Sequence, residues 1–216
     1  MHDTAMDNGG RFFDTYCLDR QVTIVDIGAQ DVNGSLRKVA PPDSKYIGVD
    51  FVEGDGVDIV LQDPYSFPIE SEYADIVVSS SCFEHSEMFW LTFKECLRIL
   101  KPHGLLYINA PSNGIPHYYP VDCWRFYPDA GQALVKWGMH CGYNPALLES
   151  YISQRIADIW EDFVAVICKD ECSAGAYKDR RIIDNHPYLV LGTERSMANW
   201  PGRALTEIGD LDYDEA

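Results

Sequence analysis

The segment from residue 22 to residue 50 constrains the fold of this chain most strongly. Residues 22–27 are a mostly apolar run, typical of a buried strand, and a turn opens at Gly28. A short helix and a second strand at residues 45–49 are expected to follow, with Asp50 at the end of that strand. In such a βαβ unit, an acid at the tip of the second strand is placed to bind both hydroxyls of a ribose. The segment therefore predicts a cofactor that contains adenosine.

The rest of the chain alternates strands with helices. Apolar residues spaced by three and four predict helices at residues 87–100 and 129–140, and Pro102 cannot continue the first of them. This alternation implies parallel strands with right-handed crossovers. We therefore expect an α/β fold with a mostly parallel, seven-stranded sheet and helices on both faces. The five remaining strands are expected at residues 57–61, 74–80, 104–110, 146–152 and 162–168.

The two ends of the chain carry separate predictions. A short amphipathic helix at residues 11–19 either covers one edge of the sheet or caps the cofactor pocket. The periodic pattern stops after Cys172, and five acids follow the last basic residue, Arg203. We expect a single domain over residues 1–172 and a C-terminal extension with an acidic tail over residues 173–216. The extension holds one apolar piece, at residues 188–191.

Composition narrows the classes of partner. The formal charge of −17 repels phosphate backbones and anionic lipids, so we expect neither nucleic acid nor a membrane as a partner. A charge that merely keeps the protein soluble is the plainer explanation. Cys168 and Cys172 lack the second pair of a zinc signature, so we expect reduced thiols and no metal. No secretory signal and no apolar run of ~20 residues is evident, which predicts a cytoplasmic protein.

The turn after the first strand bears on the choice of cofactor. A nicotinamide or flavin fingerprint, G-x-G-x-x-G, uses three glycines so that a pyrophosphate can approach a helix N-terminus. Here Gln30 and Asp31 stand in the turn, and the Asp31 carboxylate would repel a pyrophosphate. S-adenosylmethionine carries no phosphate and brings an ammonium and a sulfonium, so it suits an acid-rich pocket better. A Walker loop is absent, which argues against phosphoryl transfer.

Several motifs occur in a characteristic order along the chain. They are Asp26-Ile-Gly28, Gly48-Val-Asp50, Asp63 ahead of Ser66-Phe67-Pro68, the run from Asp75 to Glu84-His85, and the run from Arg98 to Pro111. In this order they resemble class I S-adenosylmethionine-dependent methyltransferases, most closely a small metal-independent group like methyltransferase type 11. The resemblance covers residues 12–168 and implies a Rossmann-like sheet whose last strand is antiparallel. The first motif departs from the family's D-x-G-x-G-x-G by keeping only its first glycine.

The resemblance also implies which residues bind S-adenosylmethionine. For each of the acids, a solvated loop residue is the alternative interpretation. The implied set is Asp26 and Gly28 at the methionine end, Gln30 in the turn, Asp50 at the ribose, Phe51 against the adenine, Asp63 and Pro64 at the adenine edge, and Ser79 and Ser80 beneath the sulfonium.

Methyl transfer is a direct displacement, for which the enzyme supplies positioning and, for a hydroxyl acceptor, a base. His85 is the first candidate because it follows the fourth strand at the mouth of the predicted crevice, and its ordinary pKa of ~6.5 suits proton removal. The alternative is a histidine that caps the helix starting at residues 86–87.

The loop over residues 111–127 gathers a second set of candidates. Its prolines and glycine indicate a shaped loop, and mixed polar and aromatic residues are typical of a site for sugars or aromatic metabolites. His117 and Asp122 are catalytic candidates, although Asp122 could instead pair with Arg125. The candidates for substrate binding are Tyr119, Trp124 and Arg125. Similar loops resemble those of bacterial methyltransferases of surface-polysaccharide assembly.

These observations predict a methyltransferase that acts on oxygen, with nitrogen as the second choice, of a small molecule or glycan. Two other hypotheses stay open: a methyltransferase-like binding module without turnover, favoured by the altered glycine motif, and a nicotinamide-dependent oxidoreductase, disfavoured by the same turn. The sequence leaves the acceptor, the methylated atom and the oligomeric state undetermined.

Overall fold

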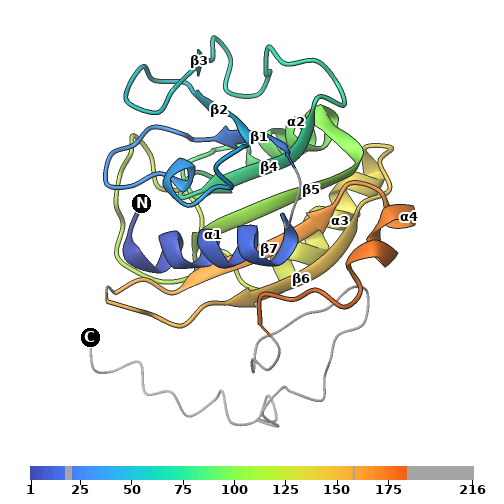
Figure 1. Ribbon diagram of the computed structural model, residues 1–216. Coiled ribbons are helices and arrows are strands. Elements are labelled where there is room, and N and C mark those ends of the chain that lie inside the picture. The colour runs from blue at the N-terminus through green and yellow to red at the C-terminus, as the bar shows by residue number, and fades with distance from the viewer. Residues whose placement is uncertain (18–20, 158, 184–216) are drawn as a thin grey trace, which may run out of the picture.

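The structure, a computed structural model, describes residues 1–17, 21–157 and 159–183, and a seven-stranded sheet lies at its centre (Figure 1). The strand order is β3-β2-β1-β4-β5-β7-β6. The strands β3, β2, β1, β4 and β5 pair in parallel, and β7 runs antiparallel to both of its neighbours. This confirms the predicted fold class, including the antiparallel strand. The bounds are β1 Thr23–Ile27, β2 Lys45–Asp50, β3 Ile59–Val60, β4 Ala74–Ser80, β5 Leu100–Pro111, β6 Ala146–Ile152 and β7 Asp162–Cys168.

Helices cover both faces of the sheet, as predicted (Figure 1). On one face, α1 (Asp3–Tyr16) packs Phe12 and Tyr16 into a core with Ile24 and Ile76. On the other face lie α2 (Phe89–Ile99) and α3 (Asp129–His140). Their apolar residues build a second core with the opposite sides of the same strands, for example around Val77. Each strand of the centre therefore has apolar residues on both sides, which explains its continuous apolar run.

The N-terminal helix differs from the prediction in length and in place. It begins at Asp3 rather than at residue 11, and it lies across a face of the sheet rather than along an edge. The ring of Phe12 stacks on Tyr107 of β5 at 4.7 Å between centroids. The helix also reaches the predicted pocket, because Met1 and His2, just ahead of it, line the cavity described below. The helix therefore covers a face of the sheet instead of an edge, and only the residues just ahead of it reach the cavity.

The first crossover contains no α-helix among its described residues. In its place stands a single 3₁₀ turn, Leu36–Lys38, whose first backbone groups are capped by the Ser35 side chain. The predicted short helix is therefore wrong in type. The segment carries Gly34 at a φ of 150°, and it holds too few apolar residues for an amphipathic helix to pack on the sheet.

The described chain continues past residue 172 and packs on the domain. A short helix, α4 (Glu171–Ala174), leads to Tyr177, which is buried beside Tyr16 with 5.9 Å between ring centroids. The backbone N–H of Ile182 donates to the Glu149 carboxylate at 2.9 Å. The apolar piece at residues 188–191 and the acidic tail lie outside the described residues. No described helix is long and apolar enough to cross a membrane.

Candidate active site

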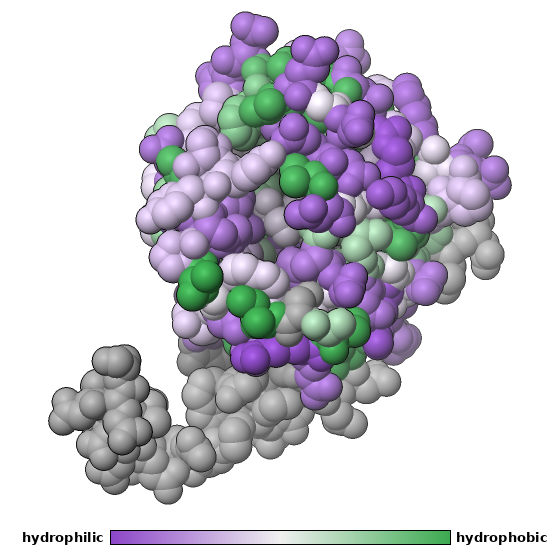
Figure 2. Space-filling view, turned by 90° about the vertical axis from the view of Figure 1, so that its left-hand side faces the viewer, coloured by the Kyte–Doolittle hydropathy of each residue, from purple (hydrophilic) through white to green (hydrophobic). Residues whose placement is uncertain are grey.

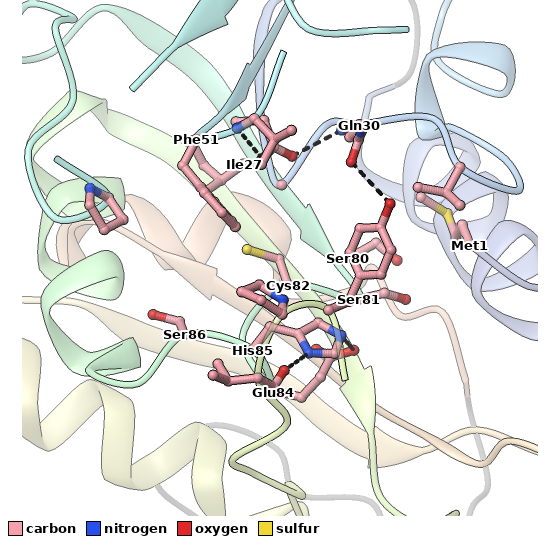
Figure 3. Close-up of a pocket in the computed structure, with 18 of the residues that line it drawn as sticks. Met1, Ile27, Gln30, Phe51, Ser80, Ser81, Cys82, Glu84, His85 and Ser86 are labelled. Atoms are coloured by element: carbon pink, nitrogen blue, oxygen red, sulfur yellow. Dashed lines mark hydrogen bonds and ion pairs between the residues drawn. The ribbon is translucent and has the colours of Figure 1, made fainter. Parts of the chain in front are cut away.

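A cavity of about 480 Å³ opens at the carboxyl edge of the parallel strands (Figure 3). This edge and the N-terminus lie on the left in Figure 1, on the side that Figure 2 turns toward the viewer. Hydrophilic residues cover most of that side, and the hydrophobic residues form separate patches (Figure 2). The chain leaves β1 toward β2, while β4 lies on the other side of β1. Such a switch in strand order is where open α/β sheets place their ligands.

Gly28 makes the close approach of the backbone at the end of β1 possible. Its φ is 82°, and an added Cβ would lie 2.5 Å from the Cβ of Cys82. Only glycine fits this position without displacing the segment after β4. Asp26, two residues earlier, does not line the cavity: it is buried, and its carboxylate accepts a hydrogen bond from the Tyr46 hydroxyl at 2.7 Å. Burial raises the pKa of Asp26 to about 7, against the effect of that hydrogen bond.

Asp50 joins the turns that follow β1 and β2. One carboxylate oxygen accepts the backbone N–H of Gln30 at 3.1 Å, and the other accepts that of Val52 at 3.2 Å. Each carboxylate oxygen can accept a further hydrogen bond from a ligand hydroxyl. Phe51, next in the chain, is about half exposed and points toward the centre of the cavity (Figure 3). An acid and a free aromatic face at one strand end suit a ribose and a base.

The predicted residues at the adenine edge and beneath the sulfonium divide between the cavity and its surroundings. Pro64 and Ser80 line the cavity. Ser79 lies behind it, fully buried, with its hydroxyl donating to the Ile27 carbonyl at 2.9 Å. Asp63 is exposed and closes its own turn by accepting the Tyr65 backbone N–H.

Three side chains, those of Glu84, His85 and His117, converge at the end of the cavity that lies beyond β4. Glu84 is fully buried, and its carboxylate lies 3.6 Å from Nε2 of His85 and 3.9 Å from Nε2 of His117. Burial raises the pKa of Glu84 to about 8 and holds the pKa of His85 below its ordinary value. His85 Nδ1 contacts the Val121 carbonyl, which can only accept, so Nδ1 carries the proton and Nε2 keeps its lone pair.

The loop over residues 111–127 is fixed by a charge pair. Arg125 donates to both oxygens of Asp122, at 2.6 and 2.8 Å, which is the clamp that the sequence left open. This bond lowers the pKa of Asp122 well below its usual range. Asp122 in turn accepts the backbone N–H of His117 at 2.7 Å and lies 3.2 Å from its Nδ1. The clamp thus orients His117 toward the cavity.

Of two aromatic candidates in this loop, one lines the cavity and the other does not. Tyr119 lines the cavity, and its hydroxyl donates to the side-chain oxygen of Gln30 at 3.5 Å. Trp124 does not line the cavity: it packs beside Phe89 and donates to the carbonyl of Ser86, which is a lining residue.

The structure therefore brings nine of the fifteen predicted site residues to one cavity. These are Gly28, Gln30, Asp50, Phe51, Pro64, Ser80, His85, His117 and Tyr119. It places the other six outside the cavity wall: Asp26, Asp63, Ser79, Asp122, Trp124 and Arg125.

Sequence reasoning assigned no role to Glu84 or to Met1, His2 and Trp160, which also line the cavity. Glu84 belongs to the motif that runs from Asp75 to His85, and its position next to His85 was the one sign in the sequence that it could be functional. The remaining three reach the cavity only through the packing of α1 and the segment before β7, for which the sequence offered no signal.

The cavity wall carries polar atoms that no described side chain or backbone group satisfies. The Ser80 hydroxyl and both Glu84 oxygens are buried without a hydrogen-bond partner among the described residues. Unpaired buried polar groups cost free energy, so a polar ligand would stabilise this arrangement. With the acid at β2 and the glycine at β1, the cavity fits S-adenosylmethionine, whose adenosine and amino-acid ends are both polar.

A family model and solved structures both relate this chain to methyltransferases. The chain is similar in structure to a Burkholderia thailandensis 1,6-didemethyltoxoflavin-N1-methyltransferase with bound S-adenosylhomocysteine, with a TM-score of 0.59 and 16% identity over 78% of this chain and 80% of that one. Residues 9–108 match the family model described as a methyltransferase domain. The chain therefore carries a stretch that matches a methyltransferase domain, within a fold like that of an S-adenosylmethionine-dependent methyltransferase.

Two further structures show how widely this methyltransferase fold is used. One is a chain of the complex between the Haloferax volcanii Trm112 methyltransferase activator and a methyltransferase, with a TM-score of 0.58 and 16% identity over 78% of this chain and 91% of that one. The other is the [4+2]-cyclase SpnF, with a TM-score of 0.55 and 13% identity over 76% and 81%. At such identities the likeness shows the fold alone. No curated protein matches this chain by sequence.

Proposed function

We propose that this methyltransferase transfers a methyl group from S-adenosylmethionine to a hydroxyl oxygen of a small molecule or glycan, with nitrogen as the second candidate atom. One observation carries the proposal. A single cavity is lined at one end by Gly28 and Asp50, and at the other by His85 and His117. The first pair suits an adenosine cofactor, and the second suits an acceptor that must lose a proton.

At the cofactor end, the strand ends provide the contacts. Asp50 would hold the ribose hydroxyls, Phe51 would lie against the adenine, and Gly28 would let the backbone approach the methionine portion. Bound S-adenosylmethionine supplies an electrophilic methyl group. The protein then needs to align the acceptor opposite the sulfur and exclude water.

At the acceptor end, His85 has the protonation state that a base requires. Its Nδ1–H is committed to the Val121 carbonyl, and burial keeps the ring neutral, so Nε2 is available to accept a proton. Tyr119 and His117 offer aromatic faces and polar atoms from the loop over residues 111–127, a combination that suits a sugar or a heteroaromatic ring. A glycan of bacterial surface polysaccharide is one such acceptor.

The alternatives make different predictions. The fold is shared with a [4+2]-cyclase, so a function without methyl transfer is one alternative. An oxidoreductase would need room for a pyrophosphate where Asp31 accepts the backbone N–H of Gly34 at 2.7 Å and pairs with Lys38. That turn is already filled by its own contacts, which disfavours a nicotinamide cofactor.

Calorimetric titration with S-adenosylmethionine, S-adenosylhomocysteine and NADH tests the cofactor, and a labelled-methyl assay over a panel of sugars, phenols and amines tests the reaction. We expect micromolar binding of the two sulfur compounds and none of NADH. Binding without transfer to any member of a broad panel would favour the binding-module alternative. Failure of both sulfur compounds to bind would refute the proposal.

A further inference from the structure

We propose that Glu84, His85 and His117 form a binding site for a first-row divalent metal ion, such as Zn²⁺, at the acceptor end of the cavity. The site itself stands independently of the proposed reaction. A role for the ion in binding the acceptor rests on the proposed function. The expectation of no metal from the sequence considered the cysteines alone, and His85 and His117 stand in two separate motifs, 32 positions apart.

The carboxylate of Glu84 is the first reason. The side chain is 1% exposed, yet neither oxygen has a hydrogen-bond partner among the described residues. The separations to the two imidazoles, 3.6 and 3.9 Å, exceed the range of a hydrogen bond. A buried carboxylate without partners is costly, and buried charges are normally paired or bound to metals.

The orientation of both imidazoles is the second reason. His85 Nδ1 contacts the Val121 carbonyl, and His117 Nδ1 faces the Asp122 carboxylate at 3.2 Å. The carbonyl fixes the proton on Nδ1 of His85. Asp122 is the nearer group to Nδ1 of His117, ahead of the Arg125 guanidinium at 3.4 Å, and a proton held there by Asp122 leaves the Nε2 lone pair free. Histidines that bind metals typically have this arrangement, with the second nitrogen donating to a carbonyl or carboxylate. Both free Nε2 atoms lie near the same Glu84 oxygen.

The spacing of the three donors is the third reason. One potential ligand atom from each of Glu84, His85 and His117 lies within 4.8 Å of the other two. Ligands of a tetrahedral zinc ion, with bonds of 2.0–2.1 Å, stand about 3.3 Å apart. Small rotations of the side chains close the difference. Figure 3 shows His85 and Glu84 directed toward each other at the cavity wall.

The donor set indicates the class of ion and its use. Two imidazoles favour Zn²⁺, Co²⁺ or Fe²⁺ over Mg²⁺ and Ca²⁺, which prefer oxygen ligands. Three protein ligands leave at least one position open, as in catalytic zinc sites. Because all three residues line the cavity, that position faces the space in which an acceptor hydroxyl would bind.

Cobalt titration tests the site directly. Full-length protein is stripped with a chelator and titrated with CoCl₂, and the visible absorption of Co²⁺ is recorded, followed by competition with ZnCl₂ and with MgCl₂. We expect one cobalt per chain, displaced by zinc and not by magnesium. A thiolate-to-cobalt band in the near ultraviolet is expected to be absent, which separates this site from the exposed Cys123 and Cys172.

Variants locate the bound ion. Glu84→Gln keeps the volume and His117→Ala alters a part-exposed side chain, and we expect each to weaken cobalt binding by ~10-fold or more. His140→Ala, at the end of α3 beside Trp137, is the matched control and is expected to bind normally. Thermal melts identify any variant that fails to fold. If one of Glu84→Gln and His117→Ala does not fold, cobalt binding by the other tests the site.

The outcomes separate the two proposals. No cobalt binding, or binding that Glu84→Gln and His117→Ala leave unchanged, would overturn the metal site while S-adenosylhomocysteine binding still supported the methyltransferase. Cobalt binding at this site without any binding of S-adenosylhomocysteine would support the metal site and count against the proposed function.

Discussion

The Asp50 carboxylate accepts the backbone N–H of Gln30 at 3.1 Å and so ties the end of β2 to the turn after β1. The acid that the proposed function assigns to the ribose therefore also shapes the turn beside it. Loss of the carboxylate removes a ligand contact and a structural contact together.

For this reason we expect Asp50→Ala to weaken S-adenosylhomocysteine binding by about 1–3 kcal/mol, measured by calorimetry. Asp55→Ala, an exposed acid in the following loop, is the control and is expected to bind normally. Equal affinities for Asp50→Ala and the unaltered protein would show that Asp50 does not contact the cofactor.

Gly28→Ala is expected to destabilise the protein and impair cofactor binding. Gly142→Ala offers a matched control, since Gly142 has a similar positive φ of 89° but no atom within 4 Å of an added Cβ. Both variants carry the conformational cost of about 1–2 kcal/mol, and Gly28→Ala adds overpacking against Cys82 of about 1–3 kcal/mol. Urea unfolding measures the difference, and equal losses would show that the close approach to Cys82 is unimportant.

His85→Ala is expected to lower turnover by ~10²-fold or more once an acceptor is known, while S-adenosylhomocysteine affinity stays within about twofold. The reason is that His85 lies at the acceptor end, where Nε2 would either accept the proton itself or bind the proposed ion that holds the acceptor. A parallel fall in cofactor affinity would instead indicate the helix-capping role that the sequence left open.

Arg125→Lys is expected to loosen the loop over residues 111–127. Lysine cannot reproduce the two bonds to Asp122 together with the bond from Nε to the Asn113 carbonyl. Hydrogen exchange followed by mass spectrometry should show faster exchange in this loop and unchanged exchange in β1 and β2. Unchanged exchange throughout would mean that the clamp does not hold the loop.

Asp26 predicts a pH dependence of stability. Its pKa is about 7 in the folded protein, chiefly because of burial, and about 3.9 when unfolded. Between these values the folded state binds the extra proton, so this contribution to stability falls as pH rises, by about 1.4 kcal/mol per pH unit. Asp26→Asn should make the slope between pH 5 and pH 7 in urea unfolding shallower by about that amount, while the contribution of Glu84, whose pKa is also raised, stays. Parallel pH profiles for the two proteins would contradict the shift.

The sheet was predictable because most of its strands coincide with short apolar segments of the sequence. Strands β4, β6 and β7 have the predicted bounds, and β4 and β7 are mostly apolar segments that are buried over almost their whole length. Asp26 shows the limit of motif reasoning: the acid lies in the expected strand, but alternation along β1 turns its side chain toward Tyr46 and away from the cavity.

Glu84 shows a second limit. Its environment depends on His117, which folding brings close through the clamp between Asp122 and Arg125. A contact between residues 33 positions apart leaves no periodic trace in a single sequence. The same holds for Met1 and His2, which reach the cavity only because α1 lies across the face of the sheet.

The two ends of the cavity have different origins along the chain. Gly28, Asp50 and Ser80 fall within residues 9–108, the part that matches the methyltransferase model, whereas Met1, His2, Trp160 and the loop over residues 111–127 fall outside it. The common part of the family therefore builds the half of the cavity that suits the cofactor. Apart from Glu84 and His85, the half that would select an acceptor is built from segments outside the matched part, so replacing those segments should redirect specificity while the cofactor half is left intact.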